Sequence, residues 1–81
     1  MLTKNLTGDG EKYFSYAKQI AWRSGPKRWS IVQPVEKVAK FNKENPDVIA
    51  SATTNQHIRT VREYLVSEGY KVIDVPYLTT K

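Results

Sequence analysis

The sequence predicts a small α/β domain, with α+β as the alternative class, in which three helices pack on a sheet of two or three short strands. Three stretches repeat apolar residues every three or four positions, as amphipathic helices do. Two short runs are rich in strand-forming residues and end at proline. Helices that alternate with short apolar strands are typical of two-layer α/β domains.

The first helix is expected between Asp9 and Gly25. Asp9 can cap a helix, because its carboxylate accepts hydrogen bonds from the first unpaired N–H groups. Gly25 would end the helix, since glycine readily adopts the left-handed conformation at that position and the following proline cannot continue a helix. The apolar side chains that recur between these ends are Tyr13, Phe14, Ala17, Ile20 and Ala21.

A short strand is expected at residues 29–33, a β-rich run bounded by Pro34. Pro34 suits the first position of a second helix, where its missing N–H costs nothing. The Asn45-Pro46 pair would end that helix. Residues 47–52 fit either a short buried strand or an irregular loop.

A third helix is expected to begin at Thr53, which forms a capping-box pattern with Gln56. Apolar residues continue at helical spacing to Gly69, a second glycine that can end a helix. Residues 70–75 are then predicted to form a strand. If it pairs with residues 47–52 across the third helix, the unit should be a right-handed parallel crossover.

The chain is expected to be one globular domain over residues 1–81, with loose tails at about 1–8 and 77–81. No apolar run approaches the roughly 18 residues that a membrane span needs, so no contact with a membrane is expected. The start of the chain has no apolar region of the kind that secretory signals contain. Cysteine is absent, which favours a reducing compartment for so small a domain. These features together predict a cytoplasmic protein.

The formal net charge is +5, and it is unevenly distributed. Residues 18–43 contain seven basic residues and one acidic residue, whereas the remaining 55 residues contain six basic and seven acidic ones. A positive excess confined to one third of the chain points to a polyanion or an acidic protein surface as partner. The alternative is a solvated face that keeps the protein in solution.

The segment from Trp22 to Trp29 combines both tryptophans, three cations and a turn in eight residues. Proteins hold single-stranded nucleic acids in this way, with cations on the phosphates and flat side chains stacked on the bases. Both tryptophans could instead belong to the core. The residues predicted to bind nucleic acid, with RNA favoured, are Trp22, Arg23, Lys27, Arg28, Trp29, Lys37, Lys40 and Lys43.

No catalytic residues, metal ligands or cofactors are predicted. His57 is the one histidine and cysteine is absent, so a metal site would lack its usual ligands. The turn before Thr53 contains no glycine, which excludes the common phosphate-binding loops. We therefore expect a binding protein rather than an enzyme.

Five tyrosines fit a protein partner as well as they fit a nucleic acid. An acidic surface of a host protein is accordingly the alternative partner. The strand at 70–75 is expected to present an open edge, because a tail alone follows it and Lys71 and Asp74 are its sole charges. This predicts a homodimer with Tyr64 and Tyr70 near the contact.

Taken as a whole, the compact frame from Met1 to Lys81 and the cluster from Trp22 to Trp29 resemble the small, basic, cysteine-free accessory proteins of tailed bacteriophages. Such proteins disarm host enzymes and defence systems. The resemblance implies an inhibitor of a host toxin or defence nuclease, acting in the cytoplasm of a bacterial host, with RNA as a bridge between the two.

Overall fold

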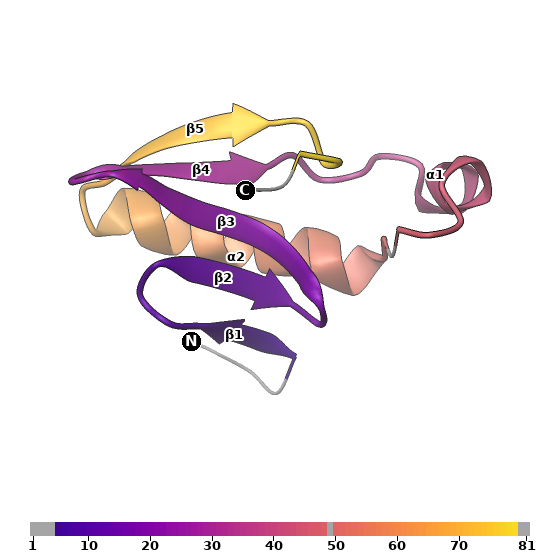
Figure 1. Cartoon of the computed structure of the whole chain (residues 1–81), viewed down its shortest axis with the longest axis horizontal. Helices are drawn as coiled ribbons and strands as arrows, with labels where there is room; N and C mark the ends of the chain where they lie inside the picture. Colours follow the sequence, from indigo (N-terminus) through magenta and orange to yellow (C-terminus); the bar gives the residue numbers. More distant parts are fainter. Residues whose placement is uncertain (1–4, 49, 80–81) are drawn as a thin grey trace.

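The computed structural model describes residues 5–48 and 50–79, which form a five-stranded mixed sheet and two helices (Figure 1). The elements are β1 (Leu6–Gly8), β2 (Lys12–Ser15), β3 (Lys18–Gly25), β4 (Arg28–Val32), α1 (Val38–Glu44), α2 (Ala52–Ser67) and β5 (Lys71–Val75). The strands lie in the order β1-β2-β3-β4-β5, antiparallel except that β5 runs parallel to β4. The predicted arrangement of three helices on two or three strands is therefore wrong.

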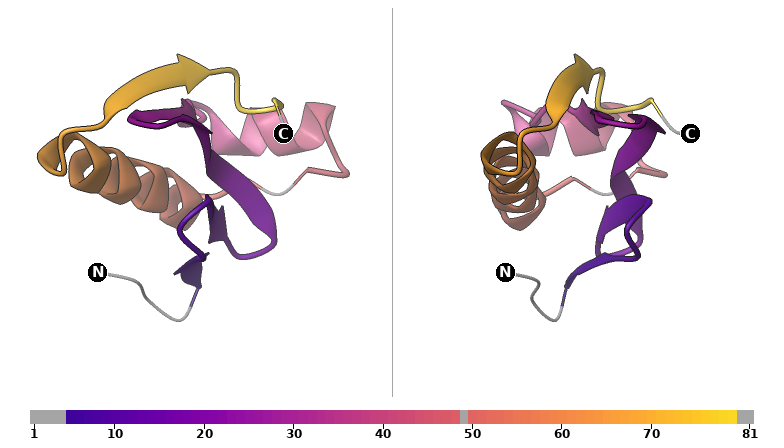
Figure 2. Two further views of the ribbon diagram at one scale, coloured as in Figure 1. Left: turned by 60° about the vertical axis from the view of Figure 1, so that its left-hand side comes forward. Right: turned by 90° about the vertical axis from the view of Figure 1, so that its left-hand side faces the viewer.

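Helix α2 lies across one face of the sheet, and α1 lies beyond one end of it (Figures 1 and 2). The turn between β3 and β4 lies at the opposite end from α1 (Figure 1). The long axis of the molecule measures 37 Å. Residues near α1 and residues near this turn are therefore well separated.

The helix predicted between Asp9 and Gly25 is wrong, because this segment forms the antiparallel pair β2–β3. Tyr16 and Ala17 make the turn between the two strands, and Tyr16 has a positive φ of 55°. The ladder hydrogen bonds of the hairpin replace those that a helix would have made within the segment.

An irregularity in the pairing explains why this hairpin looked helical in the sequence. Tyr13 pairs with Ala21 and Phe14 with Gln19, so Ile20 is an extra residue in β3. Ile20 and Ala21 are both fully buried. A β-bulge that lets consecutive residues reach the core, together with a two-residue turn, reproduces the apolar spacing of an amphipathic helix.

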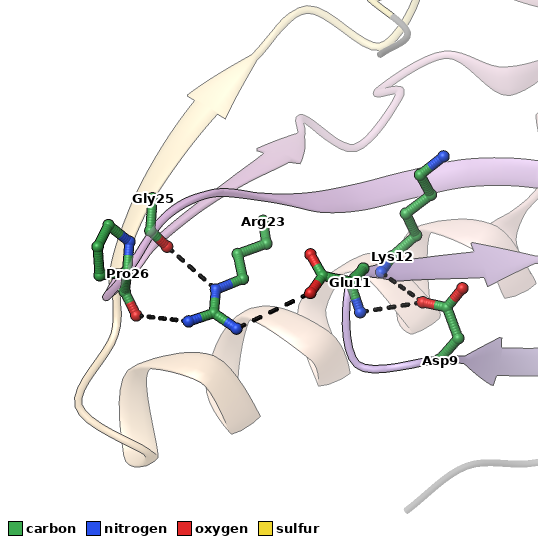
Figure 3. A network of polar contacts seen from close by, with 6 residues as sticks. All are labelled: Asp9, Glu11, Lys12, Arg23, Gly25 and Pro26. Atoms are coloured by element: carbon green, nitrogen blue, oxygen red, sulfur yellow. Dashed lines mark hydrogen bonds and ion pairs between the residues drawn. The ribbon is translucent and has the colours of Figure 1, made fainter.

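Asp9 shapes the turn between β1 and β2 instead of capping a helix. Its Oδ1 accepts hydrogen bonds from the backbone N–H groups of Glu11 and Lys12, each at 2.9 Å (Figure 3). These N–H groups stabilise the carboxylate, so they hold the pKa of Asp9 below its ordinary value of 3.8.

We expect the amide resonances of Glu11 and Lys12 to titrate with a midpoint below pH 3.8 in an NMR experiment. The pKa of Asp9 is lowered in the folded state, so the ionised carboxylate stabilises the fold. This stabilisation is present above the pKa of the unfolded chain and is lost as the pH falls through the pKa of the folded protein. The variant Asp9→Asn should abolish this titration. A midpoint at or above 3.8 would show that the two hydrogen bonds do not form in solution.

Helix α1 begins at Val38 rather than at Pro34. The side chain of Asn55, in the first turn of α2, donates a hydrogen bond to the Val35 carbonyl at 2.7 Å and accepts one from the Val35 N–H at 2.9 Å. This pairing holds Val35 in the loop, so the predicted first turn does not form.

The strand considered at residues 47–52 does not form in the described residues. Asp47 and Val48 lie in a turn, Ala50 and Ser51 have no regular structure, and Ala52 already belongs to α2. Residue 49 lies outside the described part of the chain.

The strand predicted at 29–33, the third helix and the strand predicted at 70–75 are confirmed as β4, α2 and β5. The N-cap of α2 is Ser51, two residues before the expected capping residue Thr53, and its side chain accepts a hydrogen bond from the Thr54 N–H at 3.0 Å. Gly69 follows α2 with φ 87°, as its sequence position predicted. The parallel partner of β5 is β4, so both helices lie within the crossover.

The core lies between α2 and the sheet. Ile58, Val61 and Leu65 of α2 are buried there. Leu6 and Tyr77 also belong to the hydrophobic core, so the segments expected as tails pack at these residues. Within the described residues, neither α1 nor α2 has the length and apolar character of a membrane-spanning helix.

Candidate nucleic-acid interface

One face of the sheet packs against α2, and the other is turned away from it (Figure 2). On the α2 face, Asp74 forms an ion pair with Arg62, and the Ser15 hydroxyl contacts Thr54 and His57. Successive residues alternate between faces and cross-strand partners share one. We name the side away from α2 the open face, although Trp22, Ser30 and Val32 on it are buried. By the strand register it carries Lys12, Phe14, Gln19, Trp22, Arg28, Ser30, Val32, Lys71, Ile73 and Val75.

The charged residues that the described strands place on the open face are all basic, namely Lys12, Arg28 and Lys71. Arg28 and Lys71 are partners on β4 and β5, and both are exposed. Among the residues of the five described strands, Asp74 is the one that is acidic, and it lies on the α2 face. The strands therefore contribute positive charge but no carboxylate to the open face, and the Asp9 carboxylate in the turn before β2 interacts electrostatically with Lys12.

Lys27 extends this group at the turn between β3 and β4, where it is exposed. The Lys71 N–H donates a hydrogen bond to the Lys27 carbonyl at 2.9 Å, which ties the turn to the start of β5. Lys27, Arg28 and Lys71 therefore lie at one corner of the sheet, with Lys12 two strands away from Arg28. We name these four residues the basic corner.

Arg23 does not extend the open face, because its guanidinium is used to hold the turn. Its Nε donates to the Gly25 carbonyl at 3.2 Å and its Nη2 donates to the Pro26 carbonyl at 3.0 Å (Figure 3). Its Nη1 also lies 4.0 Å from Glu11 Oε1. Figure 3 shows the Lys12 side chain leading away from this ion pair.

Both tryptophans belong to the core. Trp29 is 3 % exposed, and it lies between Tyr13 and Tyr70 with ring centroids 5.3 and 6.1 Å away. Trp22 lies on the open face by register but is 6 % exposed. Neither indole offers a free ring surface on which a base could stack in this conformation. Phe14, also on the open face, is partly exposed.

The lysines of α1 are separate from the basic corner. Lys37, Lys40 and Lys43 are exposed. Two of them, Lys37 and Lys40, line a shallow surface hollow together with Glu36 and Glu44. Helix α1 lies at the end of the molecule opposite the β3–β4 turn (Figure 1). The eight residues predicted from the sequence therefore divide between the core, the β3–β4 turn and α1.

Two residues of the basic corner, Lys12 and Lys71, were missed by sequence reasoning. Lys12 fell within the segment that was expected to be helical, which hid its alternation with Tyr13. Lys71 was correctly placed in a strand, but its neighbour Arg28 is 43 positions away in the chain and meets it through parallel pairing. The alternation of Lys71 with the partly buried Val72 was the available signal.

A buried polar cluster joins β2 to α2. The Ser15 hydroxyl lies 2.7 Å from His57 Nδ1 and donates to Thr54 Oγ1 at 3.1 Å. A serine beside a histidine is the arrangement of an activated nucleophile. Ser15 has no exposed surface, however, so a substrate cannot reach its hydroxyl in this structure. The cluster fastens the N-terminal half of the sheet to α2.

Two other features of the molecule do not form a ligand site. Among residues 5–48 and 50–79, no group of three or more histidine and carboxylate side chains is arranged to hold a metal ion. A groove beside α2 and β5 has a volume of about 400 Å³ and is lined by Gln33, Pro34, Glu36, Arg59, Arg62 and Asp74. Its two carboxylates balance its two guanidinium groups, so it has no excess charge with which to attract an anion.

Comparisons with known proteins give no independent indication of function. No protein-family model matches the chain, and no curated protein and no solved structure is significantly similar to it.

Proposed function

We propose that this protein binds RNA or another single-stranded nucleic acid across the open face, with the basic corner as its main electrostatic contact. The observation that carries the proposal is the unbalanced charge of that face, where the strands contribute Lys12, Arg28 and Lys71 but no carboxylate. Lysine and arginine side chains bind phosphates through charge and hydrogen bonding, without regard to sequence.

A partly exposed aromatic ring on the same face also supports a single strand as the ligand. Several RNA-binding modules lay a single strand across the exposed face of a sheet and stack its bases on partly exposed aromatic rings. Phe14 is the partly exposed aromatic side chain of the open face. It replaces the two tryptophans in this role, because both are buried.

The test compares two double variants that remove equal charge. Arg28→Ala with Lys71→Ala removes two contacts of the basic corner, and Lys40→Ala with Lys43→Ala removes two cations from α1. Binding of a fluorescent oligouridine would be measured by anisotropy between about 50 and 200 mM salt. For the first variant, the slope of log affinity against log salt should fall by about 1.4, or about 0.7 for each lost phosphate contact.

The α1 variant should keep the salt dependence of the unmodified protein. Equal losses in both variants would mean that net charge alone attracts the nucleic acid, and the assignment of the open face would be wrong. Binding that is absent, or that does not change with salt, would remove the proposal altogether. In that case a pull-down from bacterial lysate would be compared with and without nuclease treatment. Capture of the same protein in equal amount under both conditions would favour the alternative function, inhibition of a host enzyme.

A further inference from the structure

We propose that the outer edge of β5 pairs with the β5 edge of a second copy of this chain, giving a homodimer with one continuous sheet. The described strands end at β5 on one side and at β1 on the other. Strand β1 has three residues, whereas β5 has five. In Figures 1 and 2, no described element runs along the outer edge of β5.

The edge of β5 is only partly protected against strand addition. Natural edges are protected by lysines and other charged side chains, prolines, bulges or very short strands. Lys71 and Pro76 are such features, but they lie at the start of β5 and just beyond its end. Strand β5 has the regular sequence Lys71–Val75, and the carboxylate of Asp74 is already paired with Arg62. Ile73 is 37 % exposed on the open face although it lies in the middle of the strand. The edge is therefore apolar at its centre, and apart from the paired Asp74 its exposed charge is that of Lys71 at the start of the strand.

The hydrogen bonds show which backbone groups are available. The Lys71 N–H donates to Lys27, and the Gln33 N–H donates to the Val75 carbonyl. In a parallel ladder alternate residues face the partner strand, so Lys71, Ile73 and Val75 face β4. The N–H and carbonyl groups of Val72 and Asp74 consequently point outward from the sheet.

One antiparallel register pairs all of these outward groups. With Ile73 opposite Ile73 of the second copy, Val72 faces Asp74 and Asp74 faces Val72, which allows four backbone hydrogen bonds. A shift of the register toward the end of β5 places Asp74 opposite Asp74 of the second copy. It also places Val72 opposite Pro76, which has no N–H to donate. A shift in the other direction needs the Tyr70 N–H, which already donates to Leu65. The centre of the interface is therefore Ile73.

Pairing in this register would place both open faces on the same side. Two antiparallel strands of one sheet are related by an axis perpendicular to that sheet, so the copies are not turned over. The basic corners of the two copies would then line one surface, with their Arg28 and Lys71 side chains near the dimer axis. This last consequence rests on the proposed function, whereas the dimer itself does not. Two sites on one surface would bind a long polyanion with avidity.

The experiment uses the absence of cysteine from the chain. In the proposed register Ile73 forms a non-hydrogen-bonded pair with its copy, with Cα atoms about 4.5 Å apart, within the range of a disulfide. Ile73→Cys should therefore cross-link into a covalent dimer under mild oxidation. Val66→Cys, at a residue 58 % exposed on α2, is the matched control and should cross-link much more slowly.

Light scattering, without nucleic acid, supplies the second measurement. The unmodified protein should have twice the chain mass of 9.3 kDa at micromolar concentration. Ile73→Lys should be monomeric with an unchanged circular dichroism spectrum, because two lysines would face each other in the close pair. Equal cross-linking of both cysteine variants, or a concentration-independent mass of 9.3 kDa, would overturn the dimer. If the unmodified protein is a dimer but does not bind RNA, the proposed function is wrong and the dimer stands.

Discussion

Replacing Trp29 with alanine is expected to destabilise the protein by about 3–5 kcal/mol, the cost typical of removing a large aromatic side chain from a core. Trp29 is 3 % exposed and lies beside both Tyr13 and Tyr70, so its removal leaves a cavity between these two tyrosines. Small domains have stabilities near the lower end of about 5–15 kcal/mol. The variant should therefore lose most of its stability, as measured by urea unfolding followed by circular dichroism.

Trp29→Phe is the control for this prediction. It keeps an aromatic ring between the two tyrosines and removes the indole Nε1, which is buried without a hydrogen-bond partner among the described residues. The lost volume destabilises the protein, but the loss of an unpaired donor offsets part of that effect. We expect a cost below about 2 kcal/mol. If Trp29→Ala costs no more than Trp29→Phe, Trp29 is not a core residue in solution.

Asn55→Ala is expected to lower the free energy of unfolding by about 2–6 kcal/mol. The Asn55 side chain is 9 % exposed and makes both a donor and an acceptor contact with the backbone of Val35. Alanine would leave the buried N–H and carbonyl of Val35 unpaired, and each such group costs about 1–3 kcal/mol. The loop between β4 and α1 would also lose its attachment to α2.

Asn45→Ala is the matched control, since Asn45 makes one side-chain hydrogen bond, to the Phe41 carbonyl at the end of α1. It is partly buried, and its loss should cost about 0.5–1.5 kcal/mol. Unfolding would be followed in urea for both variants, with unchanged slopes showing that the surface exposed on unfolding is the same. Equal losses of unfolding free energy in the two variants would mean that the two Asn55 hydrogen bonds contribute no more than the single, partly buried hydrogen bond of Asn45.

The elements that could be predicted from the sequence are those determined by local interactions. Helix α2 is one of these, because it carries its own cap at Ser51, a regular apolar face and an ending glycine at Gly69. The strands β4 and β5 were also predicted correctly, since each is a short β-rich run closed by a proline. In these segments the local preferences and the tertiary packing agree.

Residues 9–25 show what local preference could not decide. Their apolar spacing fits a helix, and it also fits a hairpin with a two-residue turn and a bulge at Ile20. In the hairpin conformation the Ser15 hydroxyl is hydrogen-bonded to Thr54 and His57. The hairpin also allows β3 to pair with β4. Thr54 and His57 lie 39 and 42 positions from Ser15 along the chain. Such contacts leave no trace in the spacing of the residues themselves.

The candidate site divides in the same way. The sequence alone determined that positive charge is concentrated between residues 18 and 43 and that Lys27 and Arg28 lie at a turn. The tertiary structure decided that the tryptophans are buried, that Arg23 holds the turn, and that Lys12 and Lys71 share a face with Arg28. The physical reason is that charge follows from composition, whereas the face on which a side chain lies depends on strand register and on which strands pair.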